Sequence, residues 1–250
     1  MPTAKRSQKS PRRAVAELTP DDLELERYLL DLTLQPLDRF DGFAHMEQYL
    51  LSALRYQLNY ACYALAQAQY NYTPAFTGYL TEAQANTIEK MRDKRVWGYW
   101  AHECLVGYQR WNPDPIVFAN VMYTGFFGVM LGLFETLNDK RFSEPGALTL
   151  RWSDDTEYVY EFSSLCEAIV HNMDISSHGP LYPCEPRLIY PMCNAFSLST
   201  LLIHDRLHGT DFGAGRTEQM AQAFDTHKYL QPDNRFLAAR GPLKFSMGPS

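Results

Sequence analysis

Asn112–Thr136 reads NPDPIVFANVMYTGFFGVMLGLFET, and this segment gives the clearest indication of the fold class. Two prolines interrupt the preceding structure, and the apolar run after them predicts that a buried helix begins at Ile116. Gly125, Gly128 and Gly132 fall at helical spacing in this run. Because glycine costs roughly 1 kcal/mol relative to alanine inside a helix, they indicate a face that something approaches closely, most simply a tight helix crossing.

Further helices are expected on both sides of this segment, each marked by apolar periodicity and by Pro or Gly at its ends. Their expected ranges are 19–31, 45–69, 81–100, 163–172, 194–207 with Gly209 closing it, and 216–230. Alternating patterns around Ser153-Asp154-Asp155-Thr156 predict a β-hairpin over residues 147–162. Short connections favour antiparallel helical hairpins, so the predicted fold is all-α with one β-hairpin insertion.

The domain organisation is expected to be simple, because the sequence shows no internal linker. Residues 1–18 are polar and basic and predict a disordered tail. Residues 19–230 predict a single helical domain. Residues 231–250, which contain three prolines, predict a coil tail.

Composition excludes several classes of protein. The net charge is −6 and no run of Lys or Arg follows residue 13, which argues against a nucleic-acid partner. No stretch of about 18 apolar residues predicts a membrane span, and no secretory signal is recognisable. The expected location is therefore the cytoplasm, where the five cysteines would be free thiols.

Residues 179–194 read GPLYPCEPRLIYPMCN and carry the most distinctive chemistry of the chain. Four prolines exclude a helix interior, so the segment predicts an ordered apolar loop with Cys184 and Cys193 in it. Three interpretations of the two cysteines stay open. They can form a disulfide, bind zinc together with His204 and His208, or act as free thiols that transfer protons or attack carbon.

Several short motifs, in order along residues 50–210, together resemble the linalool dehydratase/isomerase family. They are RYQL at 55–58, TPAFTGY at 73–79, VWGYW at 96–100, NPDPI at 112–116, NVMYTG at 120–125, CEP at 184–186 and CN at 193–194. The resemblance implies an (α/α)6 barrel whose hydrophobic pocket lies at a subunit boundary of a ring-shaped homo-oligomer. Since twelve helices close such a barrel and few follow Cys193, we expect the barrel to be incomplete.

The resemblance also implies a reaction, namely addition or removal of water on a terpene alcohol without any cofactor or metal. The expected partner is a hydrophobic, isoprenoid-like substrate. Catalytic roles are expected for Cys184, Cys193, Tyr56 and Asp41. Substrate contacts are expected for Tyr79, Met122, Phe126, Glu185, Asn194 and Trp100.

One departure from the family pattern affects the expected chemistry. The family places an acid–base histidine one turn after the pocket methionine, and this chain has Phe126 there. With a thiol or tyrosine as the proton donor, general acid–base catalysis is still expected, as dehydration, hydration or isomerisation. The alternative is a non-catalytic relative that binds a hydrophobic ligand.

Overall fold

The computed structural model describes residues 17–46, 54–241 and 246–249, and these are mostly helical, as predicted. The basic tail expected at residues 1–18 lies almost entirely outside them. The helices are α1 (Pro20–Thr33), α2 (Leu54–Tyr72), α3 (Gly78–Met91), α4 (Lys94–Trp97), α5 (Tyr99–Tyr108), α6 (Val121–Leu137), the short 3-10 helix η2 (Arg141–Ser143), α7 (Phe162–Ile175), α8 (Pro191–His208) and α9 (Arg216–Thr226).

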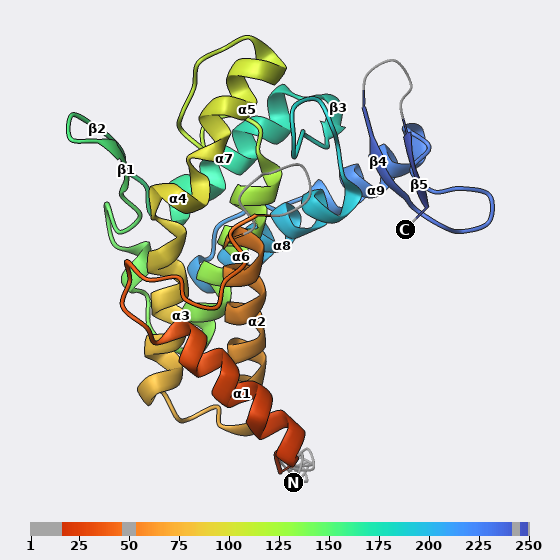
Figure 1. Cartoon of the computed structure of the whole chain (residues 1–250). Helices are drawn as coiled ribbons and strands as arrows, with labels where there is room; N and C mark the ends of the chain where they lie inside the picture. The colour runs from red at the N-terminus through yellow and green to blue at the C-terminus, as the bar shows by residue number, and fades with distance from the viewer. Residues whose placement is uncertain (1–16, 47–53, 242–245, 250) are drawn as a thin grey trace, which may run out of the picture.

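Helix α6 lies at the centre of the molecule and packs against α2, α3, α7 and α8 (Figure 1). It begins at Val121, so the expected start at Ile116 is wrong. The carboxylate of Asp114 accepts the backbone N–H groups of Ile116 (2.9 Å) and Val117 (3.3 Å), which holds this stretch in a turn. The chain then reaches the helix through Asn120, whose φ is 56°.

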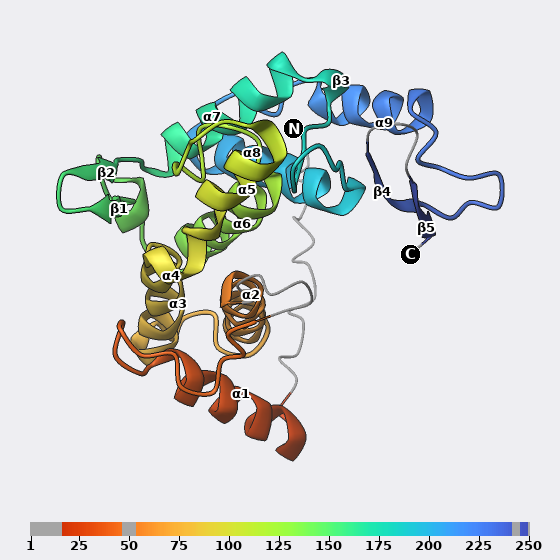
Figure 2. The ribbon, with the colours of Figure 1, turned by 45° about the horizontal axis from the view of Figure 1, so that its top comes forward.

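The α2–α3 hairpin forms the other half of the helical body, and α1 crosses beside it (Figures 1 and 2). The single helix expected over residues 81–100 is divided into most of α3, all of α4 and the start of α5. Asp93 explains the first break, because its carboxylate accepts the N–H of Arg95 at 2.8 Å and caps α4. Gly98 separates α4 from α5.

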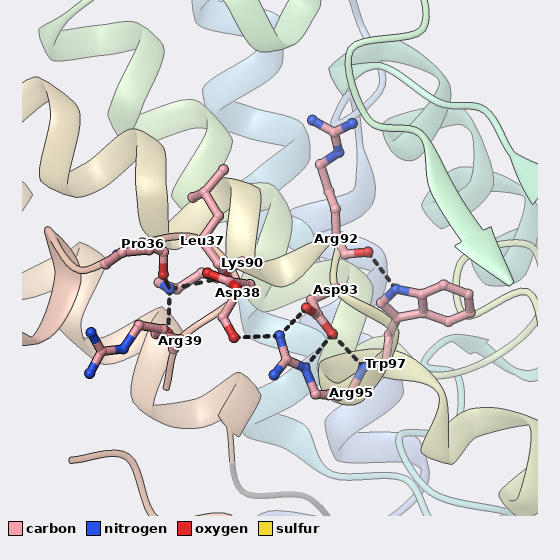
Figure 3. A network of polar contacts seen from close by, with 9 residues as sticks. All are labelled: Pro36, Leu37, Asp38, Arg39, Lys90, Arg92, Asp93, Arg95 and Trp97. Carbon is pink, nitrogen blue, oxygen red and sulfur yellow. Dashed lines mark hydrogen bonds and ion pairs between the residues drawn. The ribbon is translucent and has the colours of Figure 1, made fainter. Parts of the chain in front are cut away.

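Lys90 ties the α1–α2 connection to α3 (Figure 3). Its side chain is only 1% exposed, and Nζ donates to the carbonyl oxygens of Pro36 (2.6 Å), Leu37 (3.2 Å) and Arg39 (2.6 Å). Burial lowers the pKa of Lys90, and the nearby Arg95 lowers it further. We call Lys90, Pro36, Leu37 and Arg39 the lysine cage.

Short strands lie at two ends of the molecule (Figures 1 and 2). The predicted hairpin is present as β1 (Leu150–Ser153) and β2 (Thr156–Tyr158), paired antiparallel. The prediction of coil after residue 230 is wrong, because β4 (Leu237–Arg240) and β5 (Ser246–Pro249) also pair antiparallel. A further strand, β3 (Ser177–Pro180), precedes the cysteine loop. Within the described residues, no helix is both long and apolar enough to cross a bilayer.

Candidate active site

Cys184 and Cys193 lie side by side in the interior. The Cys193 thiol donates a hydrogen bond to the Cys184 sulfur, with 3.4 Å between the two Sγ atoms. A disulfide bond is about 2.05 Å long, so both are free thiols in this structure. Burial raises the pKa of Cys184 well above its usual value, and the adjacent Cys193 adds to the rise. Cys184 is therefore protonated at neutral pH.

A buried asparagine fixes the shape of the loop that carries Cys184. Cys193 was expected in the same loop, but it lies with Asn194 in the first turn of α8, because Pro191 begins that helix. The side chain of Asn194 accepts the N–H of Tyr182 at 3.0 Å and donates to the carbonyl oxygens of Tyr182 (3.1 Å) and Tyr190 (3.0 Å). Inside the loop, the Cys184 N–H donates to the Leu188 carbonyl at 2.8 Å. Asn194 was expected to touch substrate, and in this structure its amide holds the loop backbone.

The glycines of α6 place Cys193 beside that helix. A Cβ on Gly125 would lie 2.8 Å from the Ser197 nitrogen and 3.2 Å from the Cys193 carbonyl oxygen of α8. A Cβ on Gly128 or Gly132 would also meet α8 at less than 3 Å. The close approach predicted from the glycine spacing is therefore a tight helix crossing, and it brings the start of α8 against α6.

Two residues predicted from the sequence, Tyr56 and Met122, lie together. The Tyr56 hydroxyl contacts Met122 Sδ, and Arg55 Nη2 lies 3.6 Å from the same sulfur. The buried Arg55 guanidinium is 4.5 Å from the ring centroid of Tyr56 and 4.3 Å from that of Tyr99. Its positive charge also counteracts the rise in the pKa of Cys184. Arg55 therefore places a cation within electrostatic range of the thiols.

Phe126, at the position where the family places a histidine, forms part of an aromatic wall. Its ring stacks on Phe196 with 4.0 Å between centroids and 10° between planes. Its edge contact with Tyr56 has a centroid distance of 6.4 Å. Tyr63 stacks on the other side of this group and donates its hydroxyl proton to the Phe126 carbonyl at 2.6 Å. We call Tyr56, Phe126, Phe196 and Tyr63 the aromatic wall.

Glu185 belongs to an acidic group next to the thiols. It accepts a hydrogen bond from the Tyr190 hydroxyl at 3.3 Å, and its charge adds to the raised pKa of Cys184. Glu103 of α5 is close enough to interact electrostatically with the negative charge of Glu185. Burial raises the pKa of Glu103, Glu185 raises it further, and Arg55 opposes the rise.

Sequence reasoning missed Arg55 and Glu103 as members of this group. Arg55 stood in a quoted motif, and a charged residue at the start of an apolar helix was a usable signal. No comparable signal marked Glu103, which follows His102 in an ordinary helical pattern.

Asp41, Tyr79 and Trp100 are not brought to the thiols. Asp41 is exposed, forms an ion pair with Arg39, and donates its backbone N–H to Gln35 Oε1 at 2.8 Å. Tyr79 is 48% exposed at the start of α3, roughly 20 Å along the α2–α3 hairpin from Tyr56. Trp100 is buried in a separate apolar cluster with Cys104 and Ala119. Their predicted roles stay predictions.

The zinc alternative is contradicted. His204 Nδ1 is 2.9 Å from Thr210 Oγ1, and His208 Nε2 is 3.1 Å from Glu135 Oε1. His204 lies eleven positions after Cys193 on α8, which corresponds to about 16 Å along the helix. In the part of the chain that the structure describes, no three His, Cys, Asp or Glu side chains are grouped to hold a metal ion.

The geometry combines a protonated thiol, a second thiol that donates to it, a buried cation and stacked aromatic rings. Such a site suits proton transfer to an apolar substrate. A family model described as linalool dehydratase/isomerase matches residues 55–247, which is most of the chain and includes every member of this site. The chain therefore belongs to the linalool dehydratase/isomerase family.

Proposed function

We propose that the protein removes water from, adds water to, or isomerises a hydrophobic alkenol such as a terpene alcohol, without a cofactor. The main observation in favour is the buried thiol pair, with 3.4 Å between its sulfur atoms, in a chain of this family. Dehydration of an alcohol needs a proton donor for the hydroxyl and an acceptor for a carbon-bound proton. A neutral thiol becomes an acceptor once it has donated.

In the dehydration direction, the S–H of Cys184 protonates the substrate hydroxyl, the C–O bond breaks, and water leaves. The positive charge of the nearby Arg55 stabilises the thiolate that remains on Cys184. That thiolate is strongly basic because its site raises the pKa of Cys184, and it removes a proton from the neighbouring carbon to give the alkene. Hydration follows the same steps in reverse.

The aromatic wall supplies the environment for developing positive charge. Rings of Tyr56 and Phe126 present π electrons to an allylic cation, an effect of about 0.5–2 kcal/mol per ring. Tyr56 is also a second candidate proton donor, because its hydroxyl lies against Met122 within the site. A reducing compartment such as the cytoplasm keeps both cysteines in the thiol state that this mechanism needs.

We further propose that the helical hairpins belong to an (α/α)6-type arrangement and that a second copy of the chain covers the site. Tyr60, 51% exposed, contacts the ring edge of Phe126, and Met192, 57% exposed, precedes Cys193. Both continue the apolar site to the surface of a single chain. The exposed Asp41 is then available to a neighbouring copy.

A non-catalytic ligand-binding role is the second candidate, and Phe126 favours it. Its stack with Phe196 fills the position of the family's acid–base histidine with an apolar ring that cannot carry a proton.

The test is incubation of purified protein with terpene alcohols of ten to twenty carbons and with their alkenes, without cofactor, followed by gas chromatography with mass detection. The Cys184→Ala, Cys193→Ala double variant is the negative control, and Cys104→Ala controls for loss of a buried thiol elsewhere. Circular dichroism checks that each variant is folded. Product that disappears only in the double variant supports the enzyme. Absence of product, with binding retained by the double variant, supports the second candidate.

A further inference from the structure

A cavity of about 620 Å³ lies next to the thiol loop. Tyr182, Pro183 and Ile189, which flank Cys184 in sequence, line it. Residues from the end of α5, the segment before α6, the end of α7, β3 and β4 also line it. The volume falls within the range of about 300–1,000 Å³ that is usual for sites binding small molecules. Neither Cys184 nor Cys193 is among its lining residues, so this cavity is distinct from the thiol site.

The charged side chains among the described lining residues of this cavity are all positive. Arg187 and Arg240 both line it, and no Asp or Glu is among its described lining residues. His178 and His227 also face it, with 4.9 Å between their ring centroids, and offer further N–H donors. In a chain of net charge −6, a cavity with two guanidinium groups and no carboxylate favours an anion.

The Arg240 side chain makes two contacts, and its Nε–H group has no hydrogen-bond acceptor in the described structure. Its Nη2 donates to the Lys228 carbonyl at 2.9 Å, and the guanidinium lies 5.7 Å from the ring centroid of Tyr229. Its Nε is buried and has no hydrogen-bond partner in the described structure. A buried donor without an acceptor is unfavourable, so a small rotation of the guanidinium that turns Nε toward an anionic oxygen in the cavity would stabilise this residue.

Two of the lining residues have a backbone conformation that is unfavourable for residues other than glycine. Arg187 has φ 63° and Ala119 has φ 50°. Each conformation costs about 1–2 kcal/mol and persists only where the surroundings impose it. The Arg187 N–H donates to the Tyr108 hydroxyl at 3.1 Å, and the Ala119 N–H donates to Asn172 Oδ1 at 2.7 Å. Such outliers gather at ligand sites, and these two line one cavity.

The rest of the cavity is apolar, with Phe118, Ile175 and Ile189 among its lining residues. We infer that the cavity binds a small amphiphile whose carboxylate or phosphate head pairs with Arg187 and Arg240 and whose hydrocarbon body covers these apolar side chains. Planar guanidinium groups suit both kinds of head, because each offers oxygen atoms to a pair of N–H donors. The inference does not depend on the proposed reaction.

Isothermal titration calorimetry of the full chain tests it with four probes: octanoate, octyl phosphate, 1-octanol and inorganic phosphate. At least one of the two charged amphiphiles is expected to bind at least tenfold more tightly than both 1-octanol and inorganic phosphate. The tighter of the two identifies the preferred head. Equal affinity for octanoate, octyl phosphate and 1-octanol, or no binding at all, overturns the inference.

Three variants locate the binding. Arg187→Gln removes an exposed guanidinium and is expected to weaken binding of the better amphiphile at least tenfold while the protein stays folded. Arg240→Gln should do the same, with circular dichroism as a check because Arg240 also contacts Lys228. Arg235→Gln is the matched control, since Arg235 pairs with Asp233 outside the cavity. Unchanged affinity in Arg187→Gln, or an equal loss in Arg235→Gln, contradicts the assignment.

Discussion

The lysine cage and the thiol site both hold polar groups away from water, and they do so in opposite ways. Each of the three N–H donors of Lys90 has its own carbonyl acceptor, at 2.6 to 3.2 Å. The sulfur of Cys184 receives one weak hydrogen bond, from Cys193, within an apolar and aromatic surrounding. A saturated polar group stabilises the fold, whereas an incompletely saturated one keeps its capacity to react with a ligand.

The largest expected effect on stability is in the lysine cage. Lys90→Met should lower the free energy of unfolding by about 3 kcal/mol, because the three hydrogen bonds of the buried ammonium group to carbonyl oxygens are lost. Urea titration measures the change. The matched variant Lys140→Met, at an exposed lysine, should change it by less than about 0.5 kcal/mol. If the two variants behave alike, the cage is not a stabilising element.

The next largest effect is expected at the crossing of α6 and α8, where helix packing also determines the position of Cys193. Gly125→Ala should cost about 2 kcal/mol, because the new Cβ meets the backbone of α8 at 2.8 Å and the helices must separate. The same shift moves Cys193, so turnover should fall as well. Gly248→Ala is the control, since a Cβ there meets nothing within 4 Å. Unchanged stability in Gly125→Ala would contradict the tight crossing.

His204 is a buried polar group on the same helix as Cys193. It is expected to make the free energy of unfolding depend on pH, by on the order of 1–2 kcal/mol. Burial and the neighbouring His208 lower its pKa from 6.5 to about 4. The unfolded chain therefore binds more protons between these two values, so this contribution to stability is lost as pH falls from 6.5 to 4.

Urea titrations across this pH range, compared with His204→Gln, isolate the effect. The difference in unfolding free energy between the two proteins should shrink as pH falls. His102→Gln, at an exposed histidine, should show the same pH dependence as the unsubstituted protein. A pH-independent difference for His204→Gln would show that His204 keeps an ordinary pKa.

The smallest effect on stability, about 1 kcal/mol or less, is expected from Cys184→Ser, because the serine oxygen still accepts the hydrogen bond from Cys193. Under the proposed mechanism, turnover should nevertheless fall at least a hundredfold, since the sulfur that we propose to transfer the proton is gone. Cys166→Ser, at a buried thiol outside the site, should leave turnover per folded molecule unchanged. Retained turnover in Cys184→Ser would remove this thiol from the mechanism.

The sequence predicted features that depend on local pattern. The helical class, the β1–β2 hairpin and the end of α8 at Gly209 were all recognisable, because each depends on residues close in sequence. The local motif also singled out Cys184 and Cys193, whose sulfur atoms lie 3.4 Å apart, although it left open how the two thiols interact.

Features that depend on tertiary contacts could not be predicted in the same way. The late start of α6 depends on the Asp114 carboxylate competing with helical hydrogen bonds, and β4 depends on a partner strand and on the distant Ile189. Arg55 and Glu103 join the site only because α2 and α5 meet the thiol loop in space. The apolar periodicity of one segment does not reveal which distant segments it contacts in the folded protein.

The backbone pairing between Ile189 and Arg240 has a consequence for synthesis of the protein. The two residues exchange hydrogen bonds of 2.8 and 3.0 Å, which anchor the thiol loop to a segment that leaves the ribosome about fifty residues later. Because chains fold progressively as they emerge, we expect α2, α3 and α6 to pack while this loop is still unanchored. The thiols therefore gain their final geometry only after residue 240 has emerged, and we expect them to be open to oxidants and to chaperones until then.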